Sequence, residues 1–70
     1  MRLKKRSFSL SGHRTSVALE EEFWAVLDAQ ARHANKAMAA FVADIDKARG
    51  DRPLASALRL TALAAAKTAP

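Results

Sequence analysis

The chain has 70 residues, is 50% hydrophobic, contains no cysteine and carries a formal charge of +5. This length predicts one small domain with a modest core, and the lack of cysteine excludes disulfides, thiolate metal sites and thiol nucleophiles. No run of about 18 apolar residues is present to span a membrane, and the basic start lacks the apolar stretch of a signal peptide. We therefore expect a soluble, cytoplasmic protein.

The positive charge is confined to one part of the chain. Residues 1–19 hold five basic residues and no acid, whereas residues 20–70 hold seven basic and seven acidic residues. This asymmetry is typical of a polyanion-binding surface attached to a neutral scaffold, and a bare basic run is also typical of a solubilising tail. The charge alone leaves both interpretations open.

The segment from His13 to Leu19, HRTSVAL, alternates between two sides and is β-branched in its middle. This pattern predicts a half-buried strand. One side of the strand carries Arg14, Ser16 and Ala18, and the other carries Thr15, Val17 and Leu19.

Two amphipathic helices are predicted after the strand. The glutamates at positions 20–22 open the first, because carboxylates in a first turn complement the positive end of the helix dipole. Asn35 ends it, since asparagine tolerates the left-handed conformation best after glycine, and Gly50 ends the second. The apolar faces are Phe23, Trp24, Val26, Leu27, Ala31 and Ala34 in the first helix and Met38, Phe41, Val42 and Ile45 in the second.

A third helix is predicted from about Pro53 to Lys67. Its main apolar stripe is Leu54, Leu58, Ala62 and Ala65. Leu60 and Leu63 point elsewhere, so this helix is apolar on two sides. Such a helix lies either between its own core and a partner or within a crowded small core.

The predicted order is one strand followed by three helices, a mainly α fold. A lone strand leaves unpaired backbone groups beside an apolar face, which is not stable in water. One candidate partner is the same strand of a second molecule across a two-fold axis. We therefore expect a homodimer.

The stretch KRSFSLSGHRTSVALEEEFW resembles the ribbon-helix-helix DNA-binding proteins of the Arc, MetJ and CopG type. It is most similar to the bacterial branch in which an SGHRTS-like segment precedes the strand and an E-x-x-F-W-like segment opens the first helix. The resemblance runs from about Lys5 to Ile45. In this family, strands from two chains form an antiparallel ribbon that enters the DNA major groove.

The resemblance implies which residues read DNA and which form the dimer core. Arg14, Ser16 and Ala18 would face the groove, where arginine can bond guanine, serine several base edges and alanine a thymine methyl. Arg14 is the main candidate for reading the base sequence. The expected dimer core is Thr15, Val17, Leu19, Phe23, Trp24, Leu27, Phe41, Val42 and Ile45.

Family members also bind a backbone phosphate with the amides that begin the second helix. This chain has Asn35 where the family prefers glycine and Ala37 where it prefers serine or threonine, so the amides remain but the capping hydroxyl is absent. Lys36 would compensate as a point charge. The expected phosphate contacts are Arg2, Lys4, Lys5, Arg6, His13, Lys36 and Ala37.

Two arrangements are open for residues 1–12. With Ser11 and Gly12 as a turn, a hairpin pairs Phe8 with Thr15, but a four-stranded dimer sheet would then be wider than the groove of about 12 Å admits. Alternatively Gly12 is a kink, and the segment is a basic arm along the phosphates. Its charge density favours the arm.

The chain divides into residues 1–12, a ribbon-helix-helix core at residues 13–49 and a C-terminal helix at residues 50–70. We find no enzyme motif and expect neither a cofactor nor a metal, since both histidines lack ligands at suitable spacing. The sequence predicts a homodimeric transcriptional regulator that binds duplex DNA. The alternative is a protein-interaction module, such as an antitoxin or a relative that no longer binds DNA, with a partner on the C-terminal helix.

Overall fold

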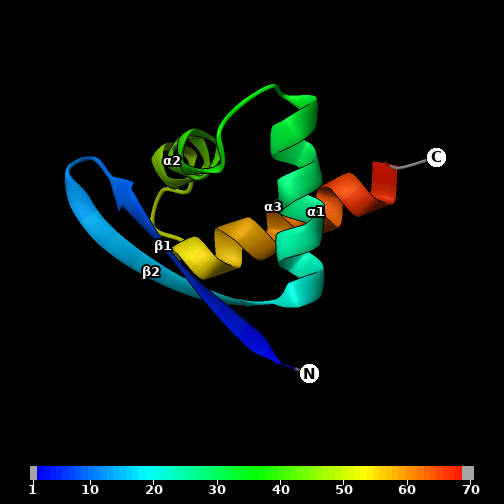
Figure 1. Ribbon diagram of the computed structural model, residues 1–70, viewed down its shortest axis with the longest axis horizontal. Helices are drawn as coiled ribbons and strands as arrows, with labels where there is room; N and C mark the ends of the chain where they lie inside the picture. Colours follow the sequence, from blue (N-terminus) through cyan, green and yellow to red (C-terminus); the bar gives the residue numbers. More distant parts are fainter. Residues whose placement is uncertain (1, 69–70) are drawn as a thin grey trace.

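The computed structural model describes residues 2–68, which form a β-hairpin and three helices (Figure 1). The elements are β1 (Leu3–Leu10), β2 (His13–Glu20), α1 (Glu21–His33), α2 (Met38–Ala48) and α3 (Leu54–Thr68). The hairpin lies along one side of the helices, and α3 crosses α1 (Figure 1). No helix within residues 2–68 is long and apolar enough to cross a membrane.

The strand predicted at residues 13–19 is paired with a second strand from the same chain. Ser11 and Gly12 form the turn with φ of 51° and 82°, a left-handed pair whose twist suits a two-residue hairpin. Phe8 lies opposite Thr15, as the hairpin arrangement requires. The expectation of a single strand is therefore corrected, and so is the preference for a free arm. Phe8 and Leu10 are the physical reason, because an arm would leave their side chains in water.

The pairing of β1 with β2 removes one reason to expect a dimer. The backbone of β2 needs a neighbouring strand for its hydrogen bonds, and β1 of the same chain is that strand. Pairing of the strand alone therefore does not require a second molecule, and the homodimer stays a prediction.

The core lies between the inner side of the hairpin and the three helices. Of the residues expected in a dimer core, five are buried and four are half-buried within one chain. The buried residues are Val17, Leu19, Trp24, Leu27 and Val42. The half-buried residues are Thr15, Phe23, Phe41 and Ile45. Phe8 and Leu10 of β1 and Leu58 and Ala62 of α3 complete the cluster.

The helix ends follow the local sequence closely. α1 ends at His33, and Asn35 adopts the left-handed conformation with φ of 57°, as expected. The Lys36 amide then donates to the Ala31 carbonyl at 2.9 Å, which satisfies an otherwise free carbonyl at the end of the helix. Gly50 adopts a φ of 62° between α2 and α3.

The third helix is apolar on two sides, as the sequence predicts. Leu58 and Ala62 are buried against the rest of the chain, whereas Leu60 and Leu63 are 45% and 46% exposed. The core of one chain therefore uses one side of α3 and leaves these two leucines at the surface.

Candidate nucleic-acid interface

The hairpin presents a polar side to solvent. Side chains alternate along both strands, so every second residue points away from the helices. This outer face consists of Lys5, Ser7 and Ser9 of β1 and Arg14, Ser16 and Ala18 of β2. Five of the six residues are exposed, and Ala18 is half-buried.

The three residues predicted to read bases share this face. The register places Arg14 opposite Ser9, Ser16 opposite Ser7 and Ala18 opposite Lys5. Sequence reasoning missed Ser7 and Ser9, and it assigned Lys5 to the phosphates. The alternation of β1 in the hairpin register was the signal that could have placed them on the same side as Arg14.

The outer face offers hydrogen-bond donors and positive charge. The hydroxyls of Ser7 and Ser16 lie 2.8 Å apart, and either can donate to the other. One hydroxyl hydrogen of this pair is therefore left for an external acceptor. Lys5 and Arg14 add an ammonium and a guanidinium, and the six residues include no carboxylate. Such a surface suits a polyanion with exposed acceptors.

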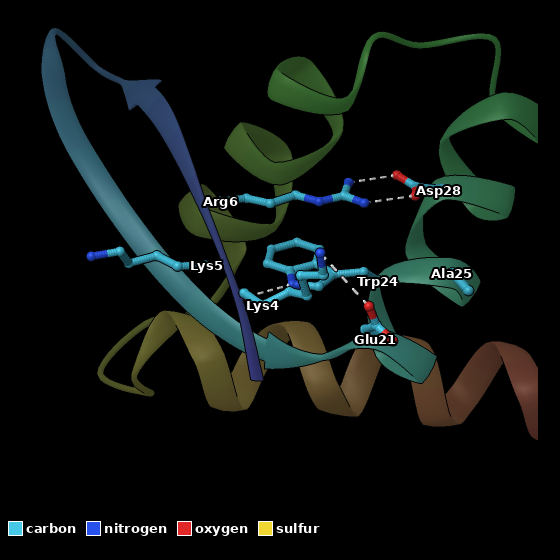
Figure 2. A pocket seen from close by; sticks show the side chains of 7 residues that line it. All are labelled: Lys4, Lys5, Arg6, Glu21, Trp24, Ala25 and Asp28. Atoms are coloured by element: carbon cyan, nitrogen blue, oxygen red, sulfur yellow. Dashed lines mark hydrogen bonds and ion pairs between the residues drawn. The ribbon is translucent and has the colours of Figure 1, made fainter. Parts of the chain in front are cut away.

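The other cations of β1 point the opposite way, towards α1. Figure 2 shows Arg6 and Lys4 directed at this helix, whereas Lys5 points away from it. The Arg6 guanidinium donates to both carboxylate oxygens of Asp28, at 2.9 and 3.1 Å. These hydrogen bonds raise the pKa of Arg6. Lys4 Nζ lies 3.8 Å from a Glu21 oxygen.

Trp24 lies at the centre of the contact between β1 and α1. Its Nε1 donates to the Lys4 carbonyl at 2.8 Å, and the Arg6 guanidinium lies 4.8 Å from its ring centroid. Phe8 packs against the same side chain with 6.0 Å between ring centroids. An open hollow of ≈ 490 Å³ lies beside these residues (Figure 2). The contact fixes β1 on the scaffold, which in turn fixes the outer face.

The start of α2 has the backbone of a helix cap without a capping side chain. Ala37 is the cap residue, with φ of −63° and ψ of 149°, and no side chain accepts a hydrogen bond from the first amides. The Lys36 ammonium is paired with Asp44, and this hydrogen bond lowers the pKa of Asp44. Lys36 is therefore already paired within the chain.

The remaining candidate residues lie near the two ends of the hairpin. Arg2 precedes β1 and is exposed, and His13 is exposed beside the turn, opposite Leu10.

Within residues 2–68, no three side chains of His, Cys, Asp or Glu are grouped to hold a metal ion.

A family model described as a ribbon-helix-helix domain matches residues 3–66. The chain belongs to the ribbon-helix-helix family. The match extends beyond the resemblance predicted up to Ile45 and includes most of α3. No curated protein and no solved structure matches the chain. The ribbon-helix-helix family is one of DNA-binding, dimerising proteins.

Proposed function

We propose that this protein is a homodimeric, sequence-specific DNA-binding protein that regulates transcription. The observation that carries the proposal is the outer face, a two-stranded ribbon with two cations, three serines and no carboxylate. A two-stranded ribbon is narrow enough to enter a major groove about 12 Å wide. The helices stand behind it and leave this side free (Figure 1).

The base-reading residues in this proposal are Arg14, Ser16 and Ala18. Arg14 has the leading role because its guanidinium can donate two hydrogen bonds to guanine O6 and N7. Ser16 can bond a base edge or a phosphate, and Ala18 can contact a thymine methyl.

The residues proposed to contact phosphates differ in whether their side chains are already paired within the chain. Arg2, Lys5 and His13 are exposed on the hairpin or at its ends. Lys4 and Arg6 are paired with carboxylates of α1, so we assign them mainly the role of holding β1 in place. Lys36 and Ala37 lie together at the start of α2, where the helix dipole favours a phosphate.

Duplex binding measured by fluorescence anisotropy at low salt tests this function. Arg14→Ala should cost about 1 to 3 kcal/mol of binding free energy and relax the base preference. Arg32→Ala, which removes the same charge from the exposed last turn of α1, is the matched control. Binding should also weaken steeply with salt. Undetectable binding of the wild-type protein at low salt contradicts the proposal.

A second candidate function is a protein-interaction module, such as an antitoxin. It is favoured by Leu60 and Leu63, which lie one turn apart on α3 with nearly half of each side chain exposed. We propose that this side of α3 contacts a second copy or a protein partner. Replacing both leucines with glutamine should lower the mass measured by light scattering towards that of a monomer. An unchanged mass and unchanged partner binding would exclude this surface.

A further inference from the structure

An open groove of ≈ 340 Å³ lies between the end of α2 and the outward side of α3. Its apolar lining includes Ile45, Ala57 and Leu60, and its charged lining residues are Arg49 and Arg52. We infer that this α2–α3 groove binds an acidic, leucine-bearing helical segment of a partner protein. The inference rests on the second candidate function and names the chemistry of the partner.

The apolar part of the groove continues along α3 as a stripe. Leu60 and Leu63 each keep nearly half of their surface exposed, and Lys67 is exposed one turn after Leu63. Residues at positions i, i+3 and i+7 of a helix share one face, so these three side chains form a row. An amphipathic helix of a partner covers such a row with leucines at the same spacing.

The hydroxyl of Thr61, which also lines the groove, already has a hydrogen-bond partner. It donates to the Ala57 carbonyl at 2.8 Å. A leucine side chain can therefore cover Thr61 without leaving its hydroxyl hydrogen unpaired. This part of the groove suits an apolar side chain.

Arg49 is held in place by its neighbours. Its Nε donates to Asp46 at 2.6 Å, and a terminal nitrogen donates to the Arg52 carbonyl at 2.7 Å. These bonds fix the guanidinium against the connection between α2 and α3. Arg49 thus forms a fixed side of the groove whose charge is balanced by Asp46.

The remaining charges of this surface favour an acidic partner. Arg52 is exposed and forms no ion pair with a carboxylate of residues 2–68. Lys67 adds a second positive charge at the far end of the stripe, and Asp51 does not line the groove. A carboxylate beside a leucine of the partner can pair with the Arg52 guanidinium through two parallel hydrogen bonds.

Other occupants suit the groove less well. In a two-fold contact a surface meets its own copy, so Arg52 and Lys67 would lie near like charges of a second chain. Duplex DNA has no apolar row to cover Leu60 and Leu63. A volume of ≈ 340 Å³ is near the lower limit for a small-molecule pocket. An acidic protein segment matches both the leucines and the charges.

The test is a titration of two fluorescent helical peptides with the full chain, followed by anisotropy. Both peptides carry leucines at positions i, i+3 and i+7, and they differ only in having glutamates or lysines at the flanking positions. We expect the glutamate peptide to bind roughly tenfold more tightly than the lysine peptide. The difference should shrink as the salt concentration rises.

Variants of the chain locate the bound peptide. Leu60→Gln should weaken binding of the glutamate peptide roughly tenfold, and Arg52→Gln roughly threefold. Leu3→Gln on β1 is the matched control for an exposed leucine, and Arg32→Gln on α1 is the matched control for an exposed arginine. Both controls should leave binding unchanged. Circular dichroism melting of each variant checks that the fold is retained.

Three results would overturn the inference while leaving DNA binding by the outer face untouched. The first is equal binding of the two peptides, and the second is no binding of either. The third is binding of the glutamate peptide that Arg14→Gln weakens and Leu60→Gln does not, because the peptide would then lie on the outer face of the hairpin. Displacement of the peptide by a short duplex would lead to the same conclusion.

Light scattering separates this inference from the function on which it rests. If the double glutamine variant of Leu60 and Leu63 lowers the mass but leaves peptide binding unchanged, the occupant is a second copy. The second candidate function then stands and the inference is overturned. If neither the mass nor peptide binding responds to this variant, both fail.

Discussion

Arg6 and Asp28 join β1 to α1 through two parallel hydrogen bonds, although they lie 22 positions apart in the sequence. The same guanidinium lies over the ring of Trp24. A residue in the most basic segment of the chain is thus directed at the scaffold, while its neighbour Lys5 points outward (Figure 2). This division along β1 gives the strand both an anchored side and a free side.

Arg6→Lys should lower the free energy of unfolding by about 1 kcal/mol, because lysine keeps the charge but loses the paired hydrogen bonds and the flat contact with Trp24. Urea unfolding followed by circular dichroism measures this change. Lys5→Gln is the control on the outer face, and its midpoint should stay within error of the wild type. Equal midpoints for Arg6→Lys and the wild type would show that the paired hydrogen bonds and the flat contact with Trp24 contribute nothing to stability beyond the charge.

Trp24→Phe should cost about 1 to 2 kcal/mol, because the aromatic ring is kept while the hydrogen bond to the Lys4 carbonyl is lost. Trp24→Ala should cost about 3 to 5 kcal/mol, since it also opens a cavity under β1. Thermal unfolding by circular dichroism compares the two variants. A loss for Trp24→Phe as large as that for Trp24→Ala would mean that a phenyl ring supplies none of the packing that the indole provides at this site.

Ala37→Ser should stabilise the protein by about 0.5 to 1 kcal/mol, because the cap residue of α2 already has a suitable backbone conformation and lacks a capping side chain. Urea unfolding measures the gain. Ala40→Ser, at an exposed position inside the same helix, should be neutral or slightly destabilising. If both serine variants behave alike, the start of α2 is not limited by its cap.

Stability should fall at acid pH partly through Glu20. Its own backbone amide and then the Arg59 guanidinium lower the pKa of Glu20 below its ordinary value of 4.5. The resulting stability is fully present above that ordinary value and is lost as the pH falls through the lowered pKa of the folded state. Glu20→Gln cannot titrate, so its urea midpoint should fall less steeply below about pH 4.5. Parallel pH profiles would exclude this carboxyl as a contributor.

Much of the fold could be predicted from short-range patterns. The β-branched alternation located β2, the glutamates located the start of α1, and Asn35 located its end. The predicted third helix, with its outward Leu60 and Leu63, is also confirmed. These features depend on periodicity and local backbone preference, which the residues themselves carry.

The arrangement of β1 could not be decided in the same way. A Ser11–Gly12 turn that pairs Phe8 with Thr15 indicated the hairpin register, but the charge density of residues 1–12 favoured an arm. The pairing of Asp28 with Arg6 depends on how α1 lies against the hairpin. Such a contact between distant segments leaves no periodic signal. The assignment of Lys4 and Arg6 to phosphates depended on the same missing information.

The proposed function requires that the outer face of the hairpin binds duplex DNA. The most direct measurement is a titration of ¹⁵N-labelled protein with duplex, followed by amide chemical shifts at low salt. We expect the largest changes at Lys5, Ser7, Ser9, Arg14, Ser16 and Ala18, and only small changes along α3. Changes confined to α1 and α3, or no changes at all, would contradict the account.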